Sequence, residues 1–158
     1  MAAAVEWLSR WCARVTVVAV LALGIALVVC ILISVFFRYI VGQALSWPEE
    51  LSMFLFTWLV LLASSLGVRE GFHVSLSIVF EHLPSPVRRA LAHLITVAII
   101  AFGAVLIYSG NDLVVRATGH LSATIGYPLE LINCSTSVCG ALIVIHGLSS
   151  LLNSEKGE

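Results

Sequence analysis

Residues 15–37, VTVVAVLALGIALVVCILISVFF, decide the fold, because this stretch carries no charged residue along its whole length. A helix needs about 20 mostly apolar residues to cross a bilayer core of about 30 Å. The whole chain has the same character: 60% of its 158 residues are hydrophobic and 11% are charged, with a mean hydropathy of +1.07. A soluble domain averages about 45–50% apolar and about 25% charged residues. The composition predicts an integral membrane protein and excludes a soluble enzyme, a disordered chain and a nucleic-acid-binding protein.

Three further apolar segments are long enough to cross a membrane. With the first they predict an all-α integral membrane protein of four transmembrane helices, at about residues 15–37, 49–68, 90–111 and 130–152. These helices form a single membrane domain over residues 1–158, because no remaining segment is long enough to fold separately. The first segment exceeds the roughly 7–15 apolar residues of a signal-peptide core, so we expect it to be retained as a true helix.

The basic residues predict the orientation of the chain. They concentrate in cytoplasmic loops of membrane proteins, and here most lie on one side of the predicted membrane: Arg10, Arg14, Arg69, Arg88, Arg89 and Lys156. Only Arg38 and Arg116 lie on the other side. We therefore expect both termini in the cytoplasm.

The loop between the second and third spans predicts a further helix. Its apolar residues recur at helical spacing, at Phe72, Leu76, Val79, Phe80 and Leu83. Some of them also fit the alternation of a strand. A lone strand would leave its backbone groups unpaired at the lipid boundary, whereas a helix pairs them internally. We therefore predict a cytoplasmic amphipathic helix over about 72–83, ended by Pro84 and Pro86, that rests on membrane lipids or on a partner protein.

The outer loops hold two groups of charged residues. Ser46, Trp47, Pro48, Glu49 and Glu50 form a helix start, with a capping serine, a first-turn proline and acidic residues that suit the helix dipole. These residues could simply cap and anchor an interfacial helix, with Trp47 in the aromatic belt. Alternatively, or in addition, Arg38 pairs with Glu49 or Glu50 and holds the hairpin in place.

Asp112 and Arg116 stand four residues apart at the end of the third span. This acid-first order favours a helical ion pair, so the span is expected to continue for a turn beyond the membrane. Such a pair could be a solvated helix end or a docking point for another protein.

The fourth span is rich in small and hydroxyl residues, among them Ser135, Ser137, Cys139 and Gly140. Residues of this kind let helix backbones approach closely in membranes. They predict a helix-packing face, used within the four-helix unit or against another subunit.

The sequence holds few residues that could form a transport site or a redox site. No charged residue lies near the middle of any span, where ion-coupled carriers place their coupling groups, so another chain should supply any transport pathway. The four cysteines form no C-x-x-C pair and predict neither zinc binding nor disulfide exchange. His93 and His146 stand at similar predicted depths and offer one alternative, a haem-binding electron carrier. A general membrane assembly factor is another.

An ordered series of motifs resembles the small membrane subunit (DctQ type) of tripartite ATP-independent periplasmic (TRAP) transporters. The series covers nearly the whole chain: Phe37-Arg38-Tyr39, Ser46-Trp47-Pro48-Glu49-Glu50, Phe54, Trp58, Gly67-Val68-Arg69-Glu70-Gly71-Phe72-His73-Val74, Leu83-Pro84, Arg88-Arg89 and Gly126-Tyr127-Pro128.

The resemblance implies a non-catalytic subunit without cofactors in a bacterial inner membrane. Its partners would be a large membrane subunit that carries the substrate and sodium sites, and a periplasmic binding protein that delivers an organic acid. The small subunit would brace the fixed part of an elevator-type carrier. Structural roles at the partner interface are implied for Arg38, Trp47, Glu49, Glu50, Arg69, Glu70 and His73.

Overall fold

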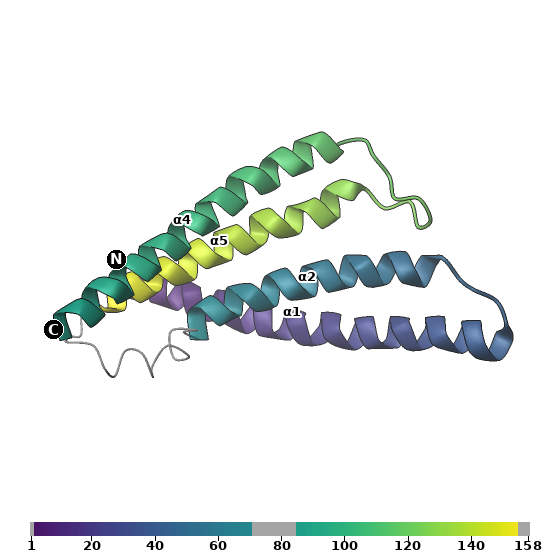
Figure 1. Ribbon diagram of the computed structural model, residues 1–158, viewed down its shortest axis with the longest axis horizontal. Helices are drawn as coiled ribbons and strands as arrows, with labels where there is room; N and C mark the ends of the chain where they lie inside the picture. The colour runs from purple at the N-terminus through teal and green to yellow at the C-terminus, as the bar shows by residue number, and fades with distance from the viewer. Residues whose placement is uncertain (1, 71–84, 155–158) are drawn as a thin grey trace.

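The computed structural model describes residues 2–70 and 85–154 and is all helical there (Figure 1). Its elements are α1 (Ala2–Phe36), the short π-helix η1 (Phe37–Val41), α2 (Trp47–Glu70), α4 (Ser85–Ala117) and α5 (Leu129–Ser154). Helices α1 and α2 pack as one antiparallel pair, and α4 and α5 as another (Figure 1). The 42–46 and 118–128 loops lie at one end of the bundle, called the loop end below. Both chain termini lie toward the other, the terminal end.

Four helices are long and apolar enough to cross a membrane, in the part of the chain that the structure describes. Their membrane-competent segments are Glu6–Val41, Trp47–Arg69, Ala90–Ala117 and Leu129–Leu151. The prediction of four spans in an all-α protein is therefore confirmed, although α1 and α4 extend beyond the predicted ends. At about 1.5 Å per residue, the 35-residue α1 measures about 50 Å and must tilt in the bilayer or project from it.

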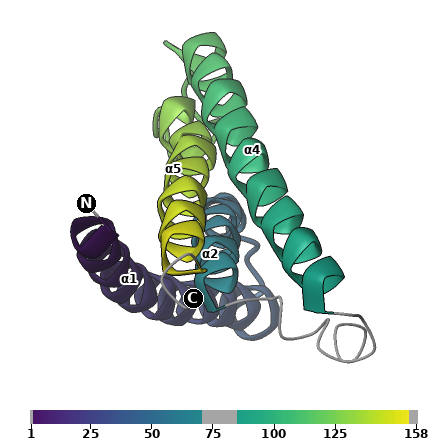
Figure 2. The ribbon, with the colours of Figure 1, turned by 90° about the vertical axis from the view of Figure 1, so that its left-hand side faces the viewer.

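Helix α5 is the central helix of the bundle. It packs against α4, α2 and α1, and Figure 2 shows it between α4 and α1. Hydrogen bonds join it to its neighbours: the Cys139 thiol donates to the Leu61 carbonyl of α2 at 3.1 Å, and the Ser137 hydroxyl donates to the Asn111 side-chain oxygen of α4 at 3.3 Å. This position explains why the small and hydroxyl residues of the sequence concentrate on this one helix.

Glycines let α4 and α5 approach closely. A Cβ atom added to Gly140 would stand 2.6 Å from the Gly103 carbonyl oxygen and 2.9 Å from the Ile107 nitrogen. Those are backbone atoms that cannot rotate away. The absence of a side chain at Gly140 is therefore what permits this helix pair to form as it does.

The third helix begins earlier than the predicted span, and one predicted element cannot be compared. Helix α4 begins at Ser85, ahead of the span predicted from about residue 90, and Pro86 lies in its first turn, where the missing proline N–H breaks no helical hydrogen bond. The amphipathic helix predicted over 72–83 falls outside the described residues, as does His73.

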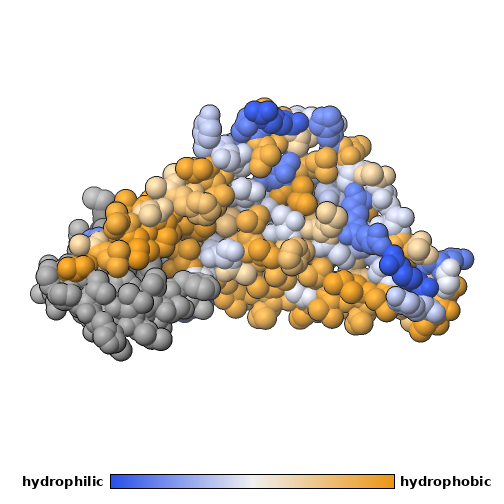
Figure 3. All heavy atoms as spheres, viewed as in Figure 1, coloured by the Kyte–Doolittle hydropathy of each residue, from blue (hydrophilic) through white to orange (hydrophobic). Residues whose placement is uncertain are grey.

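Hydrophobic side chains cover the helices, and hydrophilic ones gather toward the loop end (Figure 3). Large apolar side chains such as Val18, Leu21 and Ile25 are more than 60% exposed on α1. In water this surface would be very unfavourable, whereas in a membrane it contacts lipid or another membrane protein.

Candidate functional site

The first feature of the loop end is an ion pair across the α1–α2 hairpin. The Arg38 guanidinium donates to the Glu49 carboxylate at 2.6 Å, which confirms the predicted pairing. Arg38 lies in η1, where the helix widens before ending at Gly42, whose backbone has a positive φ of 74°. Since Glu49 binds Arg38, it does not reach back to Ser46, and the reciprocal capping arrangement is replaced by a contact between two helices.

The adjacent Glu50 connects the two halves of the molecule. Its Oε2 atom accepts hydrogen bonds from the backbone amides of Thr124 and Ile125, each at 2.9 Å. These residues belong to the 118–128 loop, whereas Glu50 lies in the first turn of α2. Bonds from two amides to one carboxylate are charge-assisted and therefore among the stronger hydrogen bonds in proteins. Glu50 thus holds the 118–128 loop against the α1–α2 hairpin.

The 118–128 loop is itself built from many hydrogen bonds. The Ser122 hydroxyl accepts from the backbone amides of Gly126 and Tyr127, and the Ser122 amide donates to the Tyr127 carbonyl at 2.9 Å. At the base of the loop, the Gly119 amide donates to the Glu130 carboxylate at 3.1 Å. The loop is therefore a defined surface rather than an unstructured linker.

An aromatic contact seats this loop on α2. The Tyr127 ring meets Phe54 edge to face, with ring centroids 5.1 Å apart. Burial, followed by the negative charge of Glu50, raises the pKa of the Tyr127 phenol. Both effects favour the neutral phenol, which suits its contact with an apolar ring.

Two further charges near the loop end form a local pair. Arg116 Nε donates to Asp112 at 2.8 Å along α4, and both side chains are at least half exposed. The predicted extension of this span and its ion pair are confirmed. Exposed pairs of this kind add little stability, so the pair is available to another molecule.

The predicted inner residues lie at the terminal end. Arg69 is exposed near the end of α2, and Glu70 ends the same helix. Close to Arg69, the His146 ring of α5 bonds through Nδ1 to the Ser9 hydroxyl of α1 at 2.8 Å. His146 is only 2% exposed, and no sequence pattern pairs it with Ser9, which lies 137 positions away.

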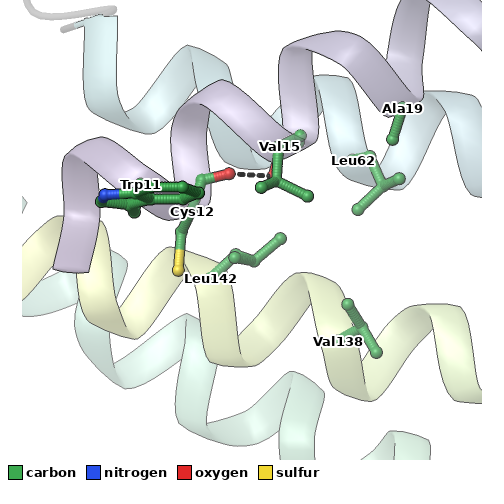
Figure 4. A pocket seen from close by; sticks show the side chains of 8 residues that line it. Trp11, Cys12, Val15, Ala19, Leu62, Val138 and Leu142 are labelled. Carbon is green, nitrogen blue, oxygen red and sulfur yellow. Dashed lines mark hydrogen bonds between the residues drawn. The ribbon is translucent and has the colours of Figure 1, made fainter.

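An apolar groove runs between α1, α2 and α5 in two adjoining parts that share Ala19 and Leu62. The part nearer the terminal end holds about 400 Å³ and is lined by larger side chains that include Trp11, Val15 and Leu142 (Figure 4). The part nearer the loop end holds about 480 Å³. It is lined by Ala19, Ala22, Leu23, Ala26, Phe54, Trp58 and Leu62.

The small and hydroxyl residues of the fourth span mostly contact other helices of this chain. Ser135, Cys139 and Gly140 are buried, and Ser137 lies against α4. Their contacts with α2 and α4 correspond to packing within the four-helix unit.

The two histidines do not face each other as haem ligands would. His146 bonds to Ser9 of α1, whereas His93 is exposed on α4. The haem-carrier alternative is therefore not favoured. Within residues 2–70 and 85–154 the cysteines are free, and no group of three or more side chains is arranged to hold a metal ion.

Comparison with known proteins gives one consistent result. Residues 27–157 match the family described as "Tripartite ATP-independent periplasmic transporters, DctQ component". The sialic acid TRAP transporter small permease protein SiaQ of Vibrio cholerae is 24% identical over 119 residues, which cover 75% of this chain and 69% of that protein. The C4-dicarboxylate TRAP transporter small permease protein DctQ of the same organism is 28% identical over 74 residues, 47% of this chain and 32% of that protein.

Proposed function

The chain belongs to the family of DctQ components of TRAP transporters, and we propose that it is the small, non-catalytic subunit that braces the large transport subunit of an organic-acid importer. Its relatives are small permease proteins of multi-component transporters. The observation that carries the bracing role is the placement of charge. In the described residues, the charged side chains lie toward the ends of the helices, while the middles of the spans hold none to couple an ion to transport.

The part of the groove nearer the loop end is the surface we assign to the large subunit. Ala19, Ala22 and Ala26 form a stripe of small side chains along α1, which lets a partner helix approach closely. Beside them the Trp58 Nε1 atom is buried without a hydrogen-bond partner among the described residues.

Co-purification tests this assignment. We expect the large subunit to travel with this chain through detergent extraction, and Ala22→Trp to weaken the association by filling the groove. Ala104→Trp, which places the same bulk on the exposed face of α4, should leave the association intact. A chain that purifies alone, with correctly folded protein verified by circular dichroism, would contradict the bracing role.

Orientation, location and substrate class complete the proposal. The terminal end faces the cytoplasmic side of a bacterial inner membrane, because most basic residues flank the spans there.

The transported solute is an organic acid, since the relatives named above serve C4-dicarboxylates and sialic acid. A sodium gradient drives uptake through the large subunit. Reconstituted complexes should therefore accumulate a labelled organic acid only when sodium is higher outside.

The predicted residues have structural roles in this proposal. The outer hairpin is shaped by Arg38, Trp47, Glu49 and Glu50. The partner is contacted at the cytoplasmic side by Arg69, Glu70 and His73.

Asp112 and Arg116 help to dock the periplasmic binding protein. Asp112→Arg combined with Arg116→Asp would preserve the ion pair while reversing the positions of its positive and negative charges at the surface where the binding protein docks. Reduced uptake at limiting binding protein, with normal co-purification of the large subunit, is the expected result.

A further inference from the structure

A polar cavity lies between α1, α2 and α5 at the terminal end. It measures about 260 Å³ and is lined by Glu6, Ser9, Arg10, Arg69, His146, Ser149 and Ser150. Both parts of the neighbouring groove are apolar, so this cavity recognises a different chemistry. It also takes no part in the contacts at the loop end.

The cavity carries an excess of positive charge. Arg10 pairs with Glu6 one helical turn away, which leaves part of its guanidinium fork for other acceptors. No ion pair joins Arg69 to a carboxylate in the described ranges, and its exposed side chain stands at the cavity wall. Two guanidinium groups therefore face one carboxylate.

His146 adds a buried polar group whose hydrogen bonding is incomplete. The Ser9 hydroxyl bonds to Nδ1 and leaves Nε2 as the second polar atom of the ring. That atom is buried and has no hydrogen-bond partner within residues 2–70 and 85–154. An unsatisfied buried polar atom, whether donor or acceptor, lowers stability. Hydroxyl groups of Ser149 and Ser150 provide further donors in the same wall.

We propose that this cavity binds a phosphate group, supplied by the headgroup of an anionic phospholipid. Arginine guanidinium groups match the oxygens of phosphate with paired, charge-assisted hydrogen bonds. The cavity lies at the ends of three apolar spans, where lipid headgroups reside, and basic pockets between transmembrane helices are typical headgroup sites.

The position of the apolar groove favours a lipid over a soluble phosphate. Arg10 lines the polar cavity, and the next two residues, Trp11 and Cys12, line the groove (Figure 4). The apolar groove therefore begins one residue farther along α1 than the cavity, so a molecule whose phosphate lies in the cavity can place an apolar part in the groove. An acyl chain fits the apolar lining of that groove, which continues past Val15 toward Ala19.

Native mass spectrometry of the full-length, delipidated protein tests the proposal with three probes. Phosphatidylglycerol offers both phosphate and acyl chains, diacylglycerol offers the chains without phosphate, and inorganic phosphate offers the anion alone. We expect phosphatidylglycerol to bind most tightly. Diacylglycerol binding as strongly would overturn the phosphate site. Inorganic phosphate binding as strongly would overturn the lipid assignment and leave a site for a soluble phosphate.

Two matched variants locate the site. Arg69→Gln should weaken phosphatidylglycerol binding about tenfold, as expected for the loss of one charge-assisted contact. Arg14→Gln removes the same charge from an exposed position of α1 that does not line the cavity, and should leave binding unchanged. Equal losses would indicate general attraction to the basic end and would overturn the proposal. Ser149→Ala, which keeps every charge, provides a further variant and should also weaken binding.

The lipid proposal and the bracing role fail separately. A chain that binds phosphatidylglycerol but never associates with a large subunit contradicts only the proposed function. A chain that assembles normally but shows no preference for the phosphate-bearing lipid contradicts only the lipid site.

Discussion

At the scale of single residues, neighbouring carboxylates have different tasks. Glu49 binds the Arg38 side chain of its own hairpin, whereas Glu50 accepts two backbone amides from a loop more than 70 positions away in the sequence. Adjacent positions on a helix point in directions about 100° apart, which allows this division. The acidic pair thus joins two separate elements of the loop end.

Replacement of Glu50 by Gln should loosen the 118–128 loop. A neutral amide oxygen accepts hydrogen bonds more weakly than a carboxylate. We therefore expect faster hydrogen–deuterium exchange at the amides of Thr124 and Ile125. Glu49→Gln is the matched control, because it removes the same charge one position away and disturbs only the bond to Arg38. Similar exchange in the two variants would show that Glu50 does not hold the loop.

Replacement of Ser9 by Ala should destabilise the packing of α1 on α5. It removes the partner of His146 Nδ1 inside an apolar bundle, where such bonds contribute about 0.5–2 kcal/mol. Thermal unfolding in detergent measures the loss. The control is Ser64→Ala, whose hydroxyl bonds only to the Val60 carbonyl of its own helix. A control that unfolds as early as Ser9→Ala would argue against a specific role for the α1–α5 bond.

At the scale of helices, the two pairs are built differently. The α4–α5 pair depends on close backbone approach at glycines, as at Gly103 and Gly140. The α1–α2 pair is joined at its loop end by side chains, through the Arg38–Glu49 ion pair and the bond from the Cys30 thiol to the Pro48 carbonyl at 3.3 Å. Added side-chain volume should therefore affect the first pair more than the second.

Gly140→Ala should destabilise the protein by about 1–3 kcal/mol, the usual cost of overpacking. The new methyl group would meet backbone atoms of α4 at 2.6 and 2.9 Å. Gly24→Ala in α1 is the control, because its methyl group would stand 3.4 Å from the nearest atom, a movable Leu59 methyl. Thermal unfolding of the two variants compares the sites, and a control that is as unstable as Gly140→Ala would contradict the close-approach argument.

At the scale of the whole molecule, the loop end acts as one connected surface. Arg38–Glu49, Glu50 with the 118–128 loop, and Phe54–Tyr127 join both helical hairpins. The terminal end is joined separately through Ser9 and His146. Changes at either end can therefore alter how the two pairs sit against a partner.

Replacement of both Glu49 and Glu50 by Lys should weaken assembly with the large subunit. The change places like charges at Arg38, removes the acceptor of the 118–128 loop and sets positive charge at the N-terminus of α2. The fraction of large subunit that co-purifies with this chain measures the effect. Arg38→Glu combined with Glu49→Arg preserves the ion pair and Glu50, and should assemble better than the double lysine variant. Full assembly of the double lysine variant with lost sodium coupling would contradict the structural role.

The proposed orientation has its own test. Alkaline phosphatase fused within the 118–128 loop should be active, and green fluorescent protein fused after residue 158 should fluoresce, because the first requires the periplasm and the second the cytoplasm. The opposite pattern would reverse the proposed orientation of both ends.

Apolar length and charge placement were sufficient to predict four spans, the ion pair of Arg38 and the extension of the third span past Asp112. Each depends on local properties, namely the length of an apolar run, the spacing of charges on one helix, or a hairpin that brings near neighbours together. The partner of Glu50 could not be predicted in this way, since nothing in a run of loop residues shows which distant carboxylate their amides will meet. The start of α4 at Ser85 could not be read from apolar length either, because the helix begins in a polar stretch ahead of the apolar run.

The sequence by itself determined that this chain is a membrane protein. The free energy of transferring a helix from water into the bilayer is set by the composition and length of its apolar segment. Only the tertiary structure decided which residues meet across helices. It brought Glu50 into hydrogen-bonding contact with the 118–128 loop, and Ser9 with His146. It also placed Arg10 and Arg69 in the wall of one cavity. Such contacts depend on how helices pack, and that packing follows from side-chain shapes on several elements at once rather than from any single segment.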